Sequence, residues 1–403
     1  MKNQHWVLLL VLLALWLGAI PVGAAESADE KVSVNQVAAA FDLYGKLSPK
    51  QGNLFFSPFS ISSAMGMVQA GARGETLAQM NRALHFGPKT HEEMLAMRRS
   101  FAAAPEEAGQ LHVANSIWPS VNYPFLPSYI ALLKDYYGVE VKPQNYKQNA
   151  EKARLLINNW VEEKTQDRIR DILQEGSLQS DTRLVLVNAI YFKAAWAYPF
   201  PEKATKNDFF YSSPNKAKLV RMMNQTETFE YKDAGDAAIL KLPYKEGLRS
   251  MLVVLPKEKH GLAALEQKLS PQLLQSWLQG MKPTRVQVAL PRFEMEDDFN
   301  LKAPLSALGM KDAFIPRVAD FSGMDGSRNL NIDLIIHKAF IAVTEKETEA
   351  AAATVVVMRA MAMLPVDPVL FRADHPFLFL IRDETTGAIL FMGRMTEPKE
   401  PKK

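Results

Sequence analysis

Hydrophobic residues recur along this chain at two spacings, one typical of helices and the other of strands. Apolar positions at helical spacing between 34 and 47 predict an amphipathic helix, with Ser33 as its N-terminal cap. Residues 60–72 are small and apolar on most faces, which predicts a buried helix. Residues 150–168 place apolar side chains among charged ones and predict an amphipathic surface helix.

Short apolar runs predict the strands. Residues 184–192 form an almost unbroken apolar run, which predicts a strand covered on both faces. Strands and helices mix without regular alternation, which favours an α+β fold. Because no linker and no internal repeat interrupts the chain between Val34 and Pro398, residues 26–398 are expected to form a single domain. Further strands are predicted at 251–255, 286–290, 332–343, 378–382 and 389–393.

The two ends of the chain differ from this domain. Lys2 precedes an apolar run at 6–17, and small residues follow Pro21, so residues 1–25 are predicted to be a signal peptide. The alternative, a membrane anchor, would need about 20 apolar residues. We therefore expect a secreted protein, extracellular or periplasmic. The Lys, Glu and Pro residues of 399–403 predict a disordered tail.

Composition excludes several classes of function. The net charge of the 403-residue chain is only +3 and is evenly spread, which argues against a nucleic-acid partner. Cysteine is absent, so disulfides, thiol nucleophiles and thiolate metal sites are excluded. The sequence shows no motif for a catalytic serine, a bound phosphate, a dinucleotide or a metal. We therefore expect no enzyme activity, no cofactor, no metal and no membrane partner.

The segment from Glu345 to Val357 has a composition suited to more than one conformation. Its four consecutive alanines favour helix, whereas its threonines and valines favour strand. In a strand, alternate side chains share a face. One face would then be small or apolar and could enter between two strands, and the other would begin with charge and could face water. The small face consists of Thr348, Ala350, Ala352, Thr354, Val356 and Met358.

That segment, together with several motifs in order along the chain, resembles the serpin family. The match begins at 53–62 (NLFFSPFSIS) and continues at 188–196 (NAIYFKAAW) and 290–293 (LPRF). It ends with 319–323 (ADFSG), 337–339 (HKA) and 376–379 (PFLF). The resemblance implies a single-domain α+β fold. It would have three β-sheets, about eight or nine surrounding helices and an exposed reactive-centre loop at about 345–369.

The resemblance also implies a mechanism, that of a suicide-substrate inhibitor of serine proteases. The protease attacks the loop and is acylated, and residues 345–361 then enter the main sheet and carry the enzyme with them. We expect a monomer that acts in this way, and a cysteine protease is a further candidate target. Two alternatives are a non-inhibitory serpin that serves as carrier, chaperone or storage protein, and a hydrolase that turns over small substrates.

The family's spacing places the reactive bond at Met361-Ala362, which suits a protease of elastase or chymotrypsin type. Cleavage at Arg359-Ala360 by a trypsin-like enzyme is the alternative, and it shortens the inserting arm by two residues, about 7 Å. Residue 347 is Glu where inhibitory members usually carry Gly, which predicts slower insertion. The hinge that the resemblance implies consists of Glu345, Lys346, Glu347, Thr348, Glu349, Ala350, Ala351, Ala352 and Ala353.

Two further clusters are implied by the resemblance alone. The first is the shutter, a polar cluster beneath the place where the main sheet opens. Its side chains are Ser57, Ser60, Asn188 and His337. The second is the breach at the top of that sheet, where Trp196 lies and where Arg292 and Glu345 are expected to form a partly exposed ion pair.

Overall fold

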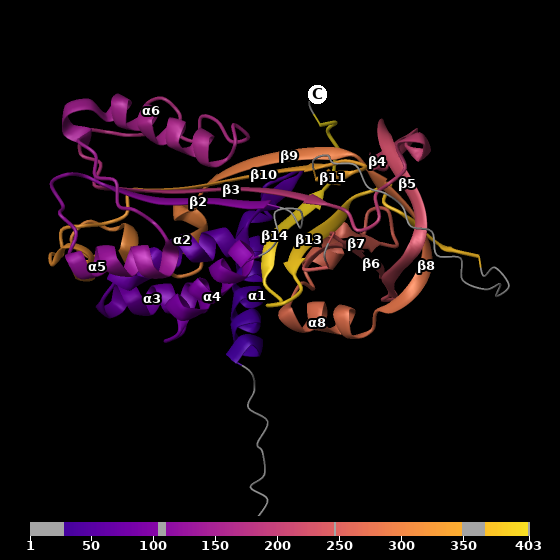
Figure 1. Cartoon of the computed structure of the whole chain (residues 1–403), viewed down its shortest axis with the longest axis horizontal. Coiled ribbons are helices and arrows are strands. Elements are labelled where there is room, and N and C mark those ends of the chain that lie inside the picture. Colours follow the sequence, from indigo (N-terminus) through magenta and orange to yellow (C-terminus); the bar gives the residue numbers. More distant parts are fainter. Residues whose placement is uncertain (1–27, 104–109, 246, 349–366, 402–403) are drawn as a thin grey trace, which may run out of the picture.

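A sheet of five strands runs along the long axis of the computed structural model, which describes residues 28–103, 110–245, 247–348 and 367–401 (Figure 1). Its two inner strands, β3 and β10, run parallel to each other, whereas the other pairings are antiparallel. β2 and β9 pair with the outer sides of this parallel pair. The strands are β2 (Gln110–Pro119), β3 (Leu184–Ala195), β9 (Phe293–Asn300), β10 (Leu334–Val343) and β11 (Glu347–Thr348).

A second sheet of nine strands crosses one end of the first (Figure 1). The resemblance implies three sheets, whereas the strands of the described residues form two hydrogen-bonded sheets. The reason is β5, whose 18 residues pair with β4 and β8 and then with β6, so that two sheets become one. The strands are β1 (Leu54–Phe56), β4 (Lys206–Ser213), β5 (Lys216–Asp233), β6 (Ala237–Pro243), β7 (Arg249–Pro256), β8 (Lys282–Pro291), β12 (Val369–Arg372), β13 (Phe377–Asp383) and β14 (Ile389–Met395).

Ten α-helices are present in the described residues, close to the eight or nine expected. The excess comes from single turns such as α10, four residues long, which hydrophobic periodicity cannot reveal. The helices are α1 (Ala28–Leu47), α2 (Pro58–Gly71), α3 (Gly74–Leu84), α4 (Thr90–Ala103), α5 (Pro127–Leu132), α6 (Tyr146–Lys164), α7 (Leu262–Glu266), α8 (Pro271–Gln279), α9 (Lys302–Ala307) and α10 (Ser322–Asp325). A π-helical segment, η2 (Leu133–Tyr137), follows α5, and 3₁₀ turns occur at Glu202–Ala204 and Asp312–Phe314.

The predicted helices and strands are present, but their ends differ by a few residues. α1 begins at Ala28, so Ser33 lies inside the helix and is not its cap. α6 begins at Tyr146, because the side chain of Asn145 accepts a hydrogen bond from the backbone N–H of Gln148 and caps the helix there. α2 begins at Pro58, one residue after Ser57, whose hydroxyl accepts from the N–H of Ser60 at 3.0 Å.

The last residues of the described chain accept hydrogen bonds from the sheets. The N–H of Glu294 in β9 donates to the carbonyl of Lys399 at 2.8 Å. The N–H of Arg221 donates to the side chain of Glu400 at 3.2 Å. Two residues of the tail that was predicted to be disordered are therefore packed on the sheet.

β3 is buried on both faces, as its apolar run predicts, and each face belongs to a different core. Leu186, Ile190 and Phe192 face the large core that α2 and the second sheet share. Val187 and Tyr191 face a smaller core, which α6 covers on the other side of the sheet (Figure 1). Any strand added beside β3 would therefore present its two faces to these two cores.

Candidate functional site: the loop ends and the main sheet

The structure describes the predicted reactive-centre loop only at its two ends. Residues 349–366 lie outside the described residues. The predicted reactive bond, Met361-Ala362, its alternative at Arg359-Ala360 and the hinge residues 349–353 are therefore not placed. The first end is β11, and the second leads into β12. Both can be built up from their contacts.

β11 lies where a new strand of the main sheet would begin. It follows β10 after a reversal of the chain at 344–346, and it pairs antiparallel with β3, Glu347 opposite Ala195 and Thr348 opposite Ala194. Farther along, β3 pairs directly with β10, in parallel, from Leu334 to Phe340. Antiparallel ladders are slightly more stable per residue than parallel ones. A strand that continued β11 between β3 and β10 would replace one parallel ladder by two antiparallel ones.

Groups of the connection between β3 and β4 hold the residues before β11. The indole Nε1 of Trp196 donates to the carbonyl of Thr344 at 3.0 Å. The ring of Trp196 stacks on Tyr244, with ring centres 4.6 Å apart and planes at 10°. The N–H of Phe200 donates to the carbonyl of Glu345 at 2.8 Å. Trp196 is 3% exposed and thus links the end of β10 to the core of the second sheet.

The side chain of Glu345 is more buried than the sequence suggests. Glu345 is 7% exposed, and the hydroxyl of Thr205 donates to its Oε1 at 2.8 Å. Arg292 is its predicted ionic partner, but Nε of Arg292 lies 3.5 Å from Oε2, which is long for a hydrogen bond. The predicted ion pair is therefore present, with the Arg292 side chain partly exposed, and Thr205 supplies a closer contact to the carboxylate.

Lys346, the next residue, is half-exposed and forms an ion pair of 2.9 Å with Glu202. This contact lowers the pKa of Glu202, through the hydrogen bond first and the charge of Lys346 second. The pair lies at the surface and contributes little to the free energy of unfolding. It fixes the direction in which the chain leaves the breach.

The four predicted shutter residues lie together in the core beneath the parallel pair. All four are 0% exposed. The N–H of Ser57 donates to Nε2 of His337 at 3.0 Å, and the hydroxyl of Ser57 donates to the carbonyl of Leu390 at 2.6 Å. Asn188 contacts His337 through its Oδ1, and its Nδ2 donates to the carbonyl of Ser60 at 3.0 Å. The cluster thus joins β3, β10 and the start of α2.

These contacts define the protonation state of His337. Nε2 accepts a hydrogen bond, so the ring is neutral and its proton lies on Nδ1, from which it is donated to Asn188. Burial of the ring, with no acidic partner to offset it, lowers the pKa of His337 from 6.5 to about 3. A cation at this position would put a second donor in front of the N–H of Ser57.

Asn115 of β2 completes the cluster, although sequence reasoning missed it. It lies opposite Asn188 in the β2–β3 pairing and contacts the Nδ2 of Asn188 through its own Oδ1. Its Nδ2 donates to the hydroxyl of Ser63 at 3.1 Å. Asn115, Asn188 and His337 therefore form one row across three neighbouring strands. Nothing in the local pattern around Asn115 signals this role.

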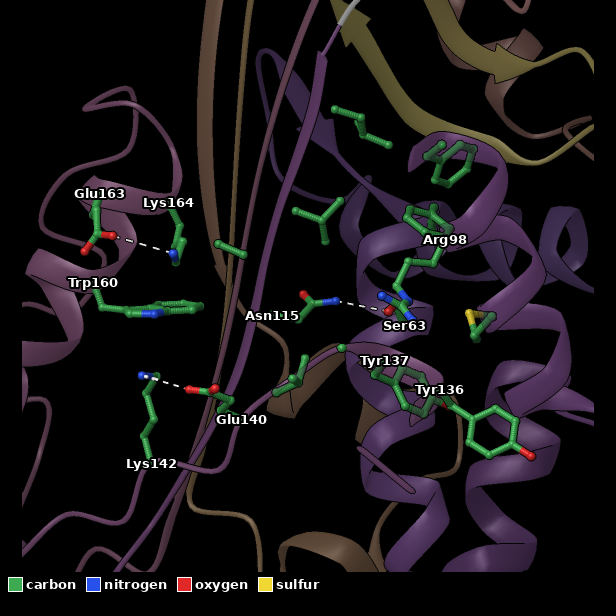
Figure 2. Close-up of a pocket in the computed structure, with 18 residues that line it drawn as sticks. Ser63, Arg98, Asn115, Tyr136, Tyr137, Glu140, Lys142, Trp160, Glu163 and Lys164 are labelled. Atoms are coloured by element: carbon green, nitrogen blue, oxygen red, sulfur yellow. Dashed lines mark hydrogen bonds and ion pairs between the residues drawn. The ribbon is translucent and has the colours of Figure 1, made fainter. Parts of the chain in front are cut away.

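A cavity of about 650 Å³ adjoins this row on the side of β2 away from β3 (Figure 2). Figure 2 shows Asn115 on one wall, Trp160 of α6 on another, and Arg98 and Tyr137 opposite.

Three other features of the described residues bear on function. No cluster of metal-ligating side chains occurs among them. None of the helices they form is both long and apolar enough to cross a bilayer. Residues Asn224-Gln225-Thr226 match the N-glycosylation acceptor sequence and lie within β5, where the side-chain amide of Asn224 donates to the carbonyls of Ala204 and Met222. That amide is thus engaged in the sheet.

The sequence profile of the serpin (serine protease inhibitor) family matches residues 34–398. An uncharacterized serpin-like protein of Thermococcus kodakarensis is 40% identical over 377 residues, which are 92% of this chain and 87% of that protein. The human leukocyte elastase inhibitor is 38% identical over 92% of this chain and 100% of its own length. The crystal structure of uncleaved ovalbumin superposes with a TM-score of 0.83 at 32% identity, covering 91% of this chain and all of that one.

The family profile covers nearly all of the described chain, and the relatives match over most of their own lengths. The family comprises protease inhibitors and members that are not inhibitors, and neither kind acts as an enzyme. The α+β architecture and the order of the motifs agree with this assignment. The chain belongs to the serpin family.

Proposed function

We propose that this protein is a secreted suicide-substrate inhibitor of serine proteases. A protease attacks Met361-Ala362, is acylated, and is carried away as residues 345–361 enter the main sheet between β3 and β10. The observation that carries the proposal is the position of β11, which already pairs with β3 at the entrance of that path.

The register of β11 supports insertion of the right residues. If this register continued along β3, Ala350 would lie opposite Phe192, Ala352 opposite Ile190 and Thr354 opposite Asn188. Side chains directly opposite each other in an antiparallel pair share a face. The small face of the loop would therefore enter the large core, where Phe192 and Ile190 lie.

The same register, if continued, would leave the charged positions on the other face. Glu349 would lie opposite Lys193, which gives a pair of opposite charges across the two strands. Glu347, where glycine is usual, already has a strand backbone in β11. Its lack of glycine's freedom therefore does not prevent the first step of pairing.

The inserted arm would cover β3 completely. Met358 would lie opposite Leu184, the first residue of β3, so that cleavage after Met361 leaves three residues to spare and cleavage after Arg359 leaves one. Thr354 would bring a hydroxyl group to Asn188 and its neighbours. The shutter could then exchange hydrogen bonds within the cluster as the sheet opens.

An elastase- or chymotrypsin-like target suits methionine at the reactive bond, and the name of one relative, leukocyte elastase inhibitor, agrees with it. A trypsin-like enzyme would instead read Arg359, and a papain-like cysteine protease could be trapped through the same acyl-enzyme chemistry. Secretion follows from the signal peptide proposed for residues 1–25, and the mature protein would act as a monomer.

The test is incubation of residues 26–403 with elastase, chymotrypsin, trypsin and papain. A denaturing gel should show a covalent complex with a serine protease. The mass of the released C-terminal fragment should show that this fragment begins at Ala362. A fragment that begins at Ala360 would move the reactive bond to Arg359. Cleavage without any complex, and without a rise in melting temperature, would instead identify a non-inhibitory serpin.

A further inference from the structure

The outer strand of the main sheet, β2, is covered along only part of its edge away from β3. Near the C-terminal end of β2 the N–H of Lys142 donates to the carbonyl of Ile117 at 3.2 Å, and the N–H of Gln144 donates to the carbonyl of Pro119 at 2.8 Å. These bonds belong to parallel bridges between β2 and residues 141–144. The edge thus already accepts a neighbouring chain over part of its length.

Residues 111–115 of the same edge lack such a neighbour. Because backbone groups alternate in direction along a strand, the N–H and C=O groups of Leu111, Val113 and Asn115 point the same way as the carbonyl of Ile117, away from β3. No backbone group of the described residues pairs with them. All three residues line the cavity of about 650 Å³, and Val113 is 37% exposed. The cavity therefore contains a row of donors and acceptors at strand spacing.

Helices enclose this open edge on both sides. Trp160 of α6 lies on one side of β2, whereas Arg98 of α4 and Tyr136 of η2 lie on the other (Figure 2). α6 and α2 cover opposite faces of the main sheet, so the edge is recessed between two layers of helix. A recessed edge favours one extended strand over pairing with a whole sheet. A strand beside residues 111–115 would have about five residues and a length of about 17 Å.

The charge at the cavity favours an acidic strand. In the part of the chain that the structure describes, no carboxylate pairs with Arg98, whose Nη2 donates to the carbonyl of Asp135 at 3.3 Å. A Cβ atom at Gly138 would lie 2.7 Å from Nη1 of Arg98, so glycine lets the guanidinium lie directly against this backbone. Arg98 is exposed and can pair with a carboxylate that enters the cavity.

Two lysines add to this positive charge. Lys142 and Lys164 line the cavity, at distances of 3.8 Å from Glu140 and 3.5 Å from Glu163. The side chains of these two glutamates are 84% and 74% exposed. Such exposed ion pairs are weak, so the lysines remain available to a carboxylate of a bound chain.

An added strand would direct alternate side chains to the two walls of the cavity. The side chain of Asn115 donates to Ser63 of α2, so the side chains of Leu111 and Val113 face the same side. Side chains directly opposite each other on neighbouring strands share a face. Residues opposite these positions would face Arg98, and the residues between them would face Trp160. The strand that fits therefore alternates acidic residues with aromatic or aliphatic ones.

We propose that the open edge of β2 at residues 111–115 is a binding site for an extended peptide segment of a partner protein. The segment adds to the main sheet as a further strand through backbone hydrogen bonds, which give affinity, while the two walls select its alternating side chains. An acidic residue pairs with Arg98, and an apolar residue packs on Trp160. This site lies on the outer side of β2 and is separate from the path proposed for the reactive loop between β3 and β10.

The first experiment asks whether the edge is open in the free mature protein, residues 26–403. Amide hydrogen exchange followed by NMR should be fast at Leu111 and Val113. It should be slow at His112 and Ala114, whose N–H groups point toward β3. Slow exchange at Leu111 and Val113 would show that the edge is already paired, and would overturn the proposal.

The second experiment measures binding of the fluorescein-labelled peptide Glu-Phe-Glu-Phe-Glu by fluorescence polarisation, up to about 1 mM. This peptide should bind, and its charge-reversed form, Lys-Phe-Lys-Phe-Lys, should bind about tenfold more weakly. N-methyl groups on the glutamates or on the phenylalanines block the N–H groups of one edge of the peptide. One of these two sets should weaken binding about thirtyfold, the factor for two lost backbone hydrogen bonds, and the other should not.

Variants of the protein locate the bound peptide. Arg98→Gln should weaken binding about tenfold, whereas the matched control Arg99→Gln, at the next exposed position of α4, should leave it unchanged. Val113→Pro should also weaken binding, because it removes an outward N–H at an edge position where proline spares the pairing with β3. The melting temperature of each variant reports whether it is folded.

Binding that ignores both Arg98→Gln and Val113→Pro would place the peptide elsewhere, such as between β3 and β10, and would overturn the proposal. Equal binding by both N-methylated peptides would also overturn it, since strand addition needs one edge of the peptide, and so would the absence of any binding. If Val113→Pro does not fold, Arg98→Gln and the N-methylated peptides decide. A failure to trap any protease would defeat the proposed function and leave this result intact.

Discussion

Acid should destabilise the native fold through one buried ring, that of His337. Below about pH 6.5 an unfolded chain protonates this histidine, whereas the native protein keeps it neutral down to about pH 3. Between these two values the unfolded state binds more protons, so the free energy of unfolding falls as pH falls. The stability that the neutral ring contributes is fully present above pH 6.5 and is lost on the way to pH 3.

The size of the effect follows from the shift in pKa. Each unit corresponds to about 1.4 kcal/mol, so the interval from 6.5 to 3 corresponds to about 5 kcal/mol. This is a large part of the 5–15 kcal/mol that is typical of folded proteins. Glutamine is the informative replacement, because its oxygen can accept from the N–H of Ser57 and its NH₂ can donate to Asn188 without titrating.

The assay is urea unfolding of wild type, His337→Gln and the exposed control His260→Gln at intervals from pH 7.5 to 3.5. The carboxylates titrate in all three proteins, so the difference between wild type and His337→Gln cancels their contribution to the pH dependence of the free energy of unfolding. The free energy of unfolding of wild type should fall more steeply than that of His337→Gln, by about 1.4 kcal/mol per pH unit below 6.5. Parallel curves for these two proteins would show that the ring is not held neutral, and the assignment of its tautomer would be wrong.

Three further predictions test the loop and the breach. Ala352→Arg should abolish the covalent complex on a denaturing gel and leave a protein that is only cleaved, because insertion would bury an unpaired charge at a cost of several kcal/mol. The control is Glu347→Ala, at a position that faces outward, which should still form the complex. Trp196→Phe should lower the free energy of unfolding by about 1 kcal/mol in urea, through the hydrogen bond lost at 3.0 Å. Thr205→Val should lower it by about 1–3 kcal/mol, since Glu345 stays buried without its closest partner, and an unchanged urea midpoint would refute that role.

Local pattern predicted those parts of the fold whose burial is uniform along the chain. β3 was predictable because both of its faces are apolar, and α2 because nearly all of its residues are buried. β5 was not predictable from local pattern. It pairs with three different strands along its length, so its buried and exposed positions do not follow one regular alternation. Helix ends were misplaced where a polar side chain such as Asn145 sets the boundary.

The candidate site was predicted as a set of residues but not as a geometry. The shutter residues came from a resemblance, and the structure brings the four together with Asn115, a partner that only strand register supplies. The breach shows the same limit. Glu345 forms the expected ion pair with Arg292, but its closer contact with Thr205 was not predicted, because it depends on the connection after β3 that brings this hydroxyl to the carboxylate.

The sequence by itself determined the alternation of small and charged residues at 347–358, and with it which face of the loop can be buried. It also determined the types of side chain that a rearranging polar cluster needs. Only the tertiary structure decided where these residues act. The direction of β11 beside β3 and the row formed by Asn188 and His337 depend on pairings between segments far apart in the chain. Such pairings arise from the summed burial of a whole domain, which no local window of sequence contains.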